Sequence, residues 1–327
     1  MKLFVYDCRS DLERSFYEKY AKEFGLEVTV TSKIPDMTNV HMAAGHDYVN
    51  TMISTVSKEM IEAWKALGVK MISTRTIGYD HFDLEAAVDN GMHLGNSDYP
   101  PDAVAEFTLM LILMTCKNAK TMMKKVDNND YTITHEPSTN LSEKVVGIIG
   151  TGKIGKSTIQ KIHPMCKEIM MYDKFINDDV LPFGTYTDLD TLFKTCDVIS
   201  LHVPSFPETK HIVNKARLAM MKPGSVVINT ARGDLIDTKA LIEALEQGQI
   251  AGAGLDVVEG ERGIVFNDLS LVGIKNHDLS VLKHMPNVIF MPHAAYYTST
   301  SIESMIKNSV KTLVLPKNAA ENPWLIV

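Results

Sequence analysis

The sequence predicts an α/β protein with two doubly wound parallel-sheet domains, one of them inserted into the other. Three observations lead to this prediction: two separate stretches in which strand-like and helix-like segments alternate, a proline pair between them, and a glycine-rich turn in mid-chain. Strands that alternate with helices are typical of an open parallel sheet covered by helices. A chain of 327 residues is long enough for two such domains.

The first alternating stretch occupies the first hundred residues. Strand patterns cover residues 2–6, 27–31, 69–74 and 92–94, and helix patterns cover residues 11–24 and 57–67. Ser57 stands where the N-cap of the second helix is expected, and Gly68 follows its end. Serine favours helix starts and glycine favours helix ends, so both residues support this helix.

Pro100 and Pro101 interrupt this alternation. Asp102 is expected to cap an apolar helix of about four turns that follows the proline pair. The dense apolar run 107–116 within it is too short to cross a bilayer and predicts a buried helix. The proline pair therefore predicts the crossing from one domain to the next.

A second alternating series begins at residue 145. Its strand candidates are residues 145–149, 169–172, 198–201, 226–229, 254–257 and 288–291. Six strands with intervening helices match a complete Rossmann sheet. The residues from 297 onward predict one amphipathic helix and an irregular tail that return to the first domain. The predicted domains are therefore 1–99 with 298–327, and 100–297, with Rossmann-like or flavodoxin-like sheets.

The turn after the first strand of this series has the sequence GTGKIG, residues 150–155. Gly150 permits a tight turn, Gly152 lets the backbone approach a pyrophosphate, and Gly155 lets helix and strand pack closely. The following helix offers its N-terminal N–H groups to the anion. Asp173 lies 18 residues beyond Gly155, at the end of the next strand. This acid favours a dinucleotide site over an ordinary glycine-rich turn.

Composition narrows the class of partner. The formal charge is −7 and no basic run is present, which argues against nucleic acid or an anionic membrane as the main partner. The first residues lack the pattern of a secretory signal, so we expect a cytoplasmic protein. The cysteines are scattered without metal-ligand spacing, which predicts reduced thiols and no metal site; they are Cys8, Cys116, Cys166 and Cys196.

Three polar residues lie just beyond strand ends of the second domain: Arg232, Glu261 and His293. Ligands of open α/β sheets bind at the carboxyl ends of the strands. Reduction of a 2-oxo acid needs a cation for the carboxylate and a proton donor that works near neutral pH, which suit arginine and histidine. A carboxylate beside the histidine favours its charged form. Each residue alone could be an ordinary loop residue, but their shared position favours an active site.

Longer segments around these residues carry a family resemblance. They are residues 73–83, 99–106, 230–237 (TARGDLID), 255–261 (LDVVEGE) and 285–298 (MPNVIFMPHAAYYT). Together they resemble the NAD-dependent D-2-hydroxyacid dehydrogenase family over nearly the whole chain. Within the family they are most similar to the D-lactate dehydrogenase branch, which includes the vancomycin-resistance enzymes. The 32 residues from Glu261 to His293 also fit this branch.

The resemblance implies a role for each matching residue. Arg232 would bind the substrate carboxylate and ketone oxygen, His293 would be the acid–base group, and Glu261 would hold it protonated. The implied substrate-binding residues are Ile77, Gly78, Tyr99, Met52 and Tyr296. The implied cofactor is NAD, with the first domain binding substrate and the chain forming a homodimer.

The implied NAD-binding residues are Gly150, Gly152, Lys153, Ile154, Gly155, Asp173, His202, Val203, Pro204, Thr230, Ala231 and Asp256. Asp173 would bind both ribose hydroxyls, and its charge would disfavour the 2′-phosphate of NADP. Asp256 would contact the nicotinamide carboxamide.

The substrate side chain is the open part of this expectation. Met52 stands where some lactate-forming relatives have an aromatic residue, and Tyr296 where several have Phe. A flexible methionine can admit a larger side chain. The expected reaction is NADH-dependent reduction of a 2-oxo acid, pyruvate first, to the (R)-2-hydroxy acid. The alternatives are 2-oxoisocaproate, phenylpyruvate or 2-oxoglutarate as substrate, the last using Arg9 or Arg75, and, more remotely, an NAD-sensing binding protein.

Overall fold

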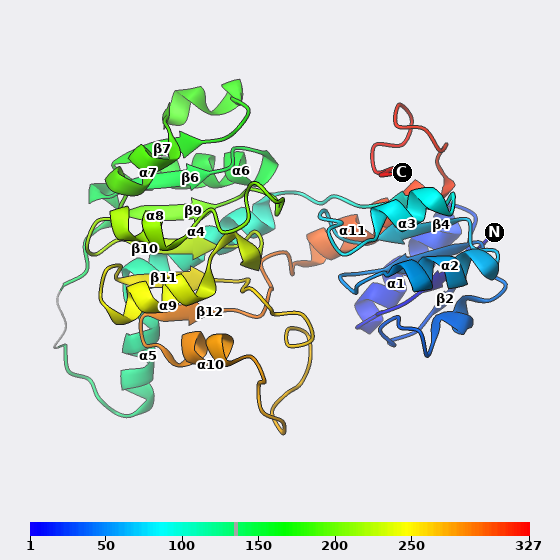
Figure 1. Ribbon diagram of the computed structural model, residues 1–327, viewed down its shortest axis with the longest axis horizontal. Coiled ribbons are helices and arrows are strands. Elements are labelled where there is room, and N and C mark those ends of the chain that lie inside the picture. The colour runs from blue at the N-terminus through cyan, green and yellow to red at the C-terminus, as the bar shows by residue number, and fades with distance from the viewer. Residues whose placement is uncertain (134–136) are drawn as a thin grey trace. The chain divides into compact units, whose positions relative to one another are not determined.

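The computed structural model describes residues 1–133 and 137–327, which divide into two compact units (Figure 1). Unit 1 comprises Met1–Pro100 and Tyr297–Val327, and unit 2 comprises Pro101–Tyr296. Each unit is built on its own parallel sheet. In the described part of the chain, no helix combines the length and apolar character needed to span a membrane.

The sheet of unit 1 has five strands in the order β2-β1-β3-β4-β5, and every pairing is parallel. This is the flavodoxin-like doubly wound order. The strands are β1 (Lys2–Val5), β2 (Glu27–Val30), β3 (Tyr48–Thr51), β4 (Met71–Thr74) and β5 (His93–Gly95). The strand order reverses between β1 and β3.

Helices cover both faces of this sheet. They are α1 (Asp11–Glu23), α2 (Lys58–Ala66), α3 (Leu84–Asp89) and α11 (Ser299–Val314), with a 3-10 turn at Val40–Ala43. Successive strand residues face opposite sides, so β1 contributes Leu3 to a core with residues of α1 and α11, and Phe4 to a core with residues of α2. The C-terminal tail rejoins the same sheet through an antiparallel bridge between Leu325 and Gly95.

The sheet of unit 2 has seven strands in the order β12-β11-β10-β9-β6-β7-β8, again all parallel. They are β6 (Val145–Ile149), β7 (Glu168–Tyr172), β8 (Thr185–Tyr186), β9 (Val198–Leu201), β10 (Val226–Asn229), β11 (Gly252–Leu255) and β12 (Val288–Phe290). The first six have the Rossmann order, which reverses between β6 and β9, and β12 extends the sheet beyond β11.

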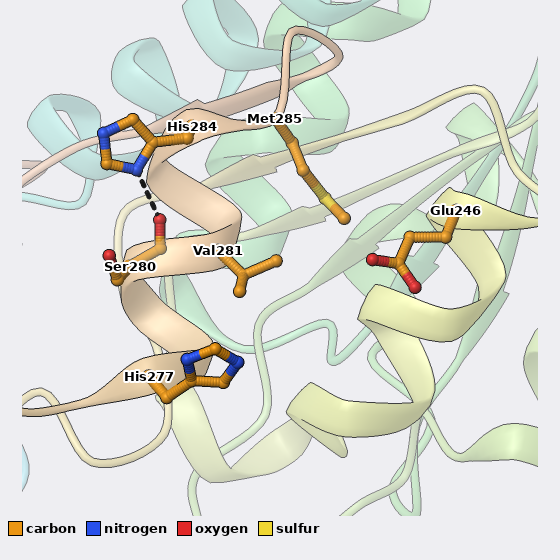
Figure 2. A pocket seen from close by; sticks show the side chains of 6 residues that line it. All are labelled: Glu246, His277, Ser280, Val281, His284 and Met285. Atoms are coloured by element: carbon orange, nitrogen blue, oxygen red, sulfur yellow. Dashed lines mark hydrogen bonds between the residues drawn. The ribbon is translucent and has the colours of Figure 1, made fainter.

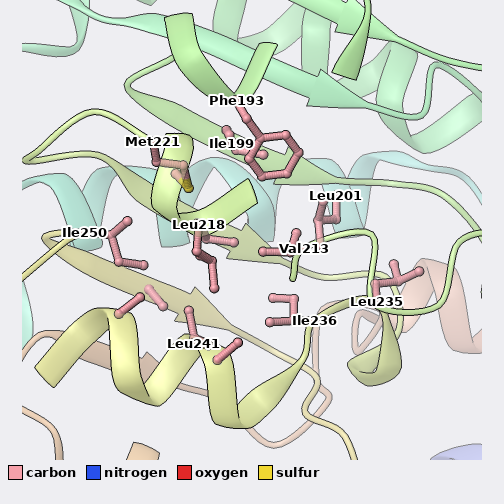
Figure 3. Close-up of a cluster of buried hydrophobic side chains, with 14 of the residues drawn as sticks. Phe193, Ile199, Leu201, Val213, Leu218, Met221, Leu235, Ile236, Leu241 and Ile250 are labelled. Atoms are coloured by element: carbon pink, nitrogen blue, oxygen red, sulfur yellow. The ribbon is translucent and has the colours of Figure 1, made fainter. Parts of the chain in front are cut away.

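Helices also cover both faces of the second sheet. They are α4 (Asp102–Cys116), α5 (Ala119–Asp127), α6 (Lys153–Ile162), α7 (Leu189–Thr195), α8 (Lys215–Met220), α9 (Thr238–Glu246) and α10 (His277–His284). One core joins α7, α8 and α9 to the sheet through residues such as Phe193, Leu218 and Leu241 (Figure 3). The other core joins α4 and α6 to the opposite face through Leu111 and Ile159. Short 3-10 turns lie at Leu141–Glu143, His163–Met165, Asp178–Phe183 and Gly233–Leu235.

The start of α4 differs from the prediction. Asp102 is the first helical residue and Pro101 occupies the N-cap position. The Asp102 carboxylate instead pairs with Lys161 Nζ at 2.8 Å, which ties α4 to α6. Ser57 does precede α2 in extended conformation, but its hydroxyl donates to Glu59 Oε2 at 2.6 Å and makes no bond to the helix backbone.

Two strands were not predicted. β3 contains Asn50 and Thr51, polar residues that suggest a loop but are completely buried here. β8 is only two residues long, too short to leave a pattern. The strand expected at residues 254–257 lies two residues earlier, at Gly252–Leu255, because Asp256 already belongs to the loop that follows β11.

Candidate active site

His293 and Glu261 form the central contact of the site. His293 follows β12 and has a left-handed backbone with φ of 57°. Its Nδ1 lies 2.6 Å from Glu261 Oε1, and the two side chains are only 15% and 12% exposed. Because Nδ1 is engaged by the carboxylate, Nε2 is the ring nitrogen suited to exchange a proton with a ligand.

The second oxygen of Glu261 is also engaged. Its Oε2 accepts a hydrogen bond from the Val258 N–H at 2.8 Å, and the Glu261 N–H donates to the Val258 carbonyl at 3.2 Å. The carboxylate is therefore held by the backbone of its own loop while it orients the imidazole. This is the arrangement by which a carboxylate fixes the tautomer of an acid–base histidine.

Asp256 holds the backbone on which His293 lies. It is fully buried, and its two carboxylate oxygens accept N–H bonds from Ala294 at 2.8 Å and Ala295 at 2.9 Å. Its carbonyl accepts the His293 N–H at 2.9 Å. Burial raises the pKa of Asp256, and the two backbone donors partly offset that rise. Thus the structure shows Asp256 bonded to the loop backbone, while its expected nicotinamide contact stays a prediction.

Arg232 lies on the neighbouring loop, directly after β10. Its Nη1 donates to the Ala231 carbonyl at 2.8 Å, and its own carbonyl accepts from Asn229 Nδ2 at 2.8 Å. The next residue must be glycine, because a Cβ on Gly233 would lie 2.2 Å from the carbonyl carbon of Val258. The loops after β10 and β11 therefore pack in direct contact. Since β10, β11 and β12 are neighbours, Arg232, Glu261 and His293 lie at one edge of the sheet.

The glycine loop lies at the same edge, between β6 and α6. Gly150 has φ of +100°, and a Cβ there would lie 2.6 Å from the backbone of His202. A Cβ on Gly155 would lie 2.0 Å from the Gly150 carbonyl oxygen. A Cβ on Gly152, in contrast, would meet nothing within 4 Å. Gly150 and Gly155 are thus required by the fold, whereas Gly152 leaves open space at the start of α6.

Asp173 stands beside this loop at the end of β7. Its Oδ2 accepts the Thr151 N–H at 2.6 Å, and its Oδ1 accepts the Phe175 N–H at 3.1 Å. The carboxylate is therefore positioned next to the glycine loop, as a ribose-binding acid must be.

His202 follows β9 on the other side of the glycine loop. Its Nε2 lies 3.0 Å from Ser200 Oγ, while its Nδ1 is shielded from solvent and has no hydrogen-bond partner among the residues that the structure describes. Burial lowers the pKa of His202 to about 4, so the ring is neutral at physiological pH. The backbone of His202 is the part that lies beside Gly150.

The remaining cofactor residues predicted from the sequence follow strands of unit 2 or begin α6. Lys153 and Ile154 are the first residues of α6. Val203 and Pro204 follow β9. Thr230 follows β10, and its Oγ1 lies 2.8 Å from Thr108 Oγ1 of α4.

The predicted substrate residues Met52, Ile77, Gly78 and Tyr99 belong to unit 1, and Tyr296 is the last residue of unit 2. The Ile77 carbonyl accepts from Asn96 Nδ2 at 2.7 Å, and the Gly78 carbonyl accepts from Thr76 Oγ1 at 2.6 Å. Met52 is only 3% exposed.

Phe266 is a site residue that the sequence analysis did not identify. Its ring centroid lies 5.8 Å from that of His293, and the Tyr296 ring lies edge-on to His293 at 6.5 Å. One signal was available in the sequence: no other aromatic residue occurs between Glu261 and α10.

One further pocket lies away from the predicted site residues. An open pocket of about 400 Å³ lies on α9 and α10 and is lined by Glu246, His277, Ser280, Val281, His284 and Met285 (Figure 2). It contains none of the predicted site residues. Among the described residues no group of three or more histidine, cysteine or acidic side chains is placed to hold a metal ion, and the four cysteines are free thiols.

Comparisons with known proteins agree with this geometry. The family model of the D-isomer specific 2-hydroxyacid dehydrogenase, NAD binding domain, matches residues 109–295. A D-specific alpha-keto acid dehydrogenase of Enterococcus faecium is 35% identical over 308 residues, 94% of this chain and 94% of that protein.

Two solved structures are also similar. A D-lactate dehydrogenase from Treponema pallidum has a TM-score of 0.85 and 31% identity over 95% of each chain. A D-2-hydroxyisocaproate dehydrogenase has a TM-score of 0.87 and 33% identity over 100% of this chain and 99% of that one. With the glycine loop and the His293–Glu261 pair on one Rossmann sheet, this chain belongs to the NAD-dependent D-2-hydroxyacid dehydrogenase family.

Proposed function

We propose that the chain reduces pyruvate, with NADH, to the (R)-2-hydroxy acid. The observation that carries this proposal is the 2.6 Å contact between His293 Nδ1 and Glu261 Oε1. It supplies an oriented proton donor at the edge of the sheet that also carries the glycine loop.

The residues present fit NAD at this edge. When bound, NADH supplies the hydride that attacks the substrate carbonyl carbon. The backbone at Gly152 and the N-terminus of α6 would hold the pyrophosphate, and Asp173 would accept hydrogen bonds from the ribose hydroxyls. His202, Val203, Pro204, Thr230, Ala231 and Asp256 border the remainder of the cofactor.

The substrate is bound and protonated by a small set of side chains. The Arg232 guanidinium binds the carboxylate and polarises the ketone oxygen. Backbone groups at Ile77 and Gly78 add to the carboxylate site, and Tyr99 lines it. His293 donates its Nε2 proton to the ketone oxygen as the carbonyl carbon is reduced, and Glu261 stabilises the imidazolium before that transfer.

The unit 1 arginines argue against 2-oxoglutarate as the preferred substrate. Arg75 is only 2% exposed and donates to the Tyr17 hydroxyl at 2.8 Å and the Asp7 carbonyl at 2.7 Å. Arg9 donates to both carboxylate oxygens of Asp7, at 2.9 and 2.7 Å. Both cations are thus committed to internal bonds, so neither is offered to a second substrate carboxylate. Bulkier monocarboxylates such as 2-oxoisocaproate and phenylpyruvate are the alternatives.

We also propose how the chain is organised in the cell. Residues 1–99 with 298–327 form the substrate domain, residues 100–297 form the NAD-binding domain, and the enzyme works in the cytoplasm as a homodimer. Apolar exposure on α5, where Met122 is 49% and Met123 60% exposed, supports burial against a second copy. Light scattering on the purified protein would show a monomer if this proposal is wrong.

The reaction is tested by measuring kcat/KM for a panel of 2-oxo acids with NADH and with NADPH. The panel contains pyruvate, 2-oxoisocaproate, phenylpyruvate and 2-oxoglutarate. The expected result is the highest value for pyruvate with NADH. A higher kcat/KM for a bulkier acid would mean that this acid is the preferred substrate, while the proposed reaction type would stand. If no acid supports NADH oxidation although NADH still binds, the proposed reduction is rejected. The alternative of an NAD-sensing binding protein is then favoured.

A further inference from the structure

The loop between β11 and α10 places the aromatic side chain of Phe266 beside His293. The rings of Phe266 and His293 have centroids 5.8 Å apart and planes inclined at 39°. Phe266 is 37% exposed, whereas the His293 side chain is 15% exposed. The phenyl ring therefore has one part against the imidazole and another part in solvent.

The backbone at Phe266 is held in an unfavourable conformation. Its φ is +66°, in the left-handed region that phenylalanine rarely adopts. Such residues persist where the surrounding structure holds them, and they concentrate at functional sites. In this conformation the Phe266 ring lies beside the His293 ring.

Glu261 anchors the turn that carries Phe266. Its carbonyl accepts N–H bonds from Ile264 at 2.9 Å and Val265 at 3.1 Å, and the Ile264 carbonyl accepts from Asn267 at 3.4 Å. The carboxylate of the same residue bonds to His293 Nδ1. One short segment thus contacts the imidazole twice, once through a carboxylate and once through a ring.

We propose that Phe266 is a positioning residue for His293. Its ring packs against the imidazole, keeps Nδ1 on Glu261 and thereby holds Nε2 in the orientation that delivers the proton. It also limits access of water to that part of the pair. This inference rests on the proposed acid–base role of His293 and adds a residue that acts through it.

The variant Phe266→Gly separates this role from a structural one. Glycine adopts φ of +66° without strain, and this relief offsets part of the stability lost with the ring contacts, so the protein should stay folded with a modestly lower melting temperature. NADH affinity should stay within about twofold, because the change is remote from the glycine loop. Turnover should fall about tenfold, since small displacements of catalytic groups are costly. The solvent isotope effect on kcat should increase as proton transfer becomes slower.

Two further variants provide the matched comparisons. Phe266→Tyr keeps the ring and should restore kcat to within about twofold of the wild type. Leu271→Gly lies in the same loop but is 97% exposed, so its kcat and isotope effect should equal those of the wild type. If Phe266→Gly does not fold, Phe266→Leu replaces it and should show the same loss relative to Phe266→Tyr.

The outcomes distinguish this inference from the proposed reaction. If the wild type reduces 2-oxo acids and Phe266→Gly keeps wild-type kcat and isotope effect, the positioning role is rejected and the reaction stands. A kcat loss shared equally by Leu271→Gly rejects it as well, because the whole loop is then responsible. If the wild type reduces no 2-oxo acid, the proposed reaction itself fails.

Discussion

The two sheets of this molecule are both doubly wound, but they differ at the point where the strand order reverses. One has open space there, and the other has a buried network of polar side chains. In unit 2 this point lies between β6 and β9, where Gly152 leaves open space at the start of α6. In unit 1 it lies between β1 and β3, where buried polar side chains bond to one another. Tyr17 of α1 donates its hydroxyl proton to Asn50 Oδ1 of β3 and accepts a bond from Arg75 Nη1 at 2.8 Å.

This polar network in unit 1 is continuous and buried. Asn50 Nδ2 donates to Ser73 Oγ at 2.7 Å, and Arg75 Nη2 donates to the Asp7 carbonyl at 2.7 Å. These residues are between 0% and 4% exposed, and burial raises the pKa of Tyr17, so its phenol remains a donor. The same topology therefore leaves open space at Gly152 in one unit and holds a buried polar network in the other. Side chains at this point decide which of the two is formed.

The largest effect is expected for His293→Ala, which tests whether the proton donor lies at the carboxyl ends of the unit 2 strands. His293→Ala should lower kcat by roughly 10²–10⁴-fold, the usual contribution of a general acid. NADH affinity, measured by fluorescence titration, should change little. His277→Ala, on the exposed surface of α10, is the control and should keep wild-type turnover. Near-normal turnover in His293→Ala would place the proton donor elsewhere and remove the basis of the comparison.

Two glycines of the glycine loop should respond differently to one added methyl group. Gly155→Ala places a Cβ 2.0 Å from the Gly150 carbonyl oxygen, so it should destabilise the fold by about 1–3 kcal/mol or more. Gly152→Ala meets nothing within 4 Å, so stability should fall by only about 1 kcal/mol, the cost of alanine at an N-cap position. Its NADH Kd should nevertheless rise roughly tenfold, equivalent to about 1.4 kcal/mol, because the pyrophosphate must approach this backbone closely.

Denaturant unfolding and NADH titration of both variants provide the measurement. Unchanged NADH affinity in a stable Gly152→Ala protein would show that the open space at the start of α6 is not the pyrophosphate site.

A substitution in the buried polar network of unit 1 should change the free energy of unfolding and leave NADH affinity unchanged. Tyr17→Phe keeps the ring but removes the donor to Asn50 Oδ1 and leaves Arg75 Nη1 with only its 3.5 Å bond to the Tyr6 carbonyl. The free energy of unfolding should fall by about 1–3 kcal/mol, the usual cost of an unsatisfied buried polar group. Tyr131→Phe is the control, since Tyr131 is 73% exposed. No loss in Tyr17→Phe, measured by denaturant unfolding, would mean that water replaces the hydroxyl and that unit 1 also has open space at this point.

The difference between the two reversal points also explains what the sequence could predict. β6, β9 and β10 match their predicted bounds because buried central strands are continuous apolar runs flanked by turns. β3 was missed because Asn50 and Thr51 are polar, and their burial depends on partners such as Tyr17 and Ser73 that are distant in sequence.

The same reasoning applies to the site residues. Gly150, Glu261 and His293 were identified from their positions relative to strands, which is local information. Phe266 was missed because its approach to His293 depends on the turn anchored by the Glu261 carbonyl, which no spacing rule describes. Arg75 was considered a possible pocket cation, yet the network of unit 1 engages it completely within the fold.

The smallest expected effect concerns acid stability and originates beside the glycine loop of unit 2. The backbone of His202 lies beside Gly150, and burial lowers the pKa of the His202 ring to about 4 from the ordinary 6.5. Above pH 6.5 the ring is neutral in both the folded and the unfolded chain, so its titration does not lower the free energy of unfolding. Below that pH the unfolded chain binds a proton that the folded chain does not accept until about pH 4, so stability falls with pH.

Between pH 7.5 and 5.5 this difference should lower the free energy of unfolding by about 1.4 kcal/mol, one pKa unit of linkage. His202→Gln cannot titrate and should lose correspondingly less stability over the same interval. His277→Gln, on exposed α10, should behave like the wild type. An identical pH dependence in His202→Gln and wild type would mean that the ring is solvated. The open space would then be wider at β9 than the structure shows, and the contrast with the buried polar network of unit 1 would be greater still.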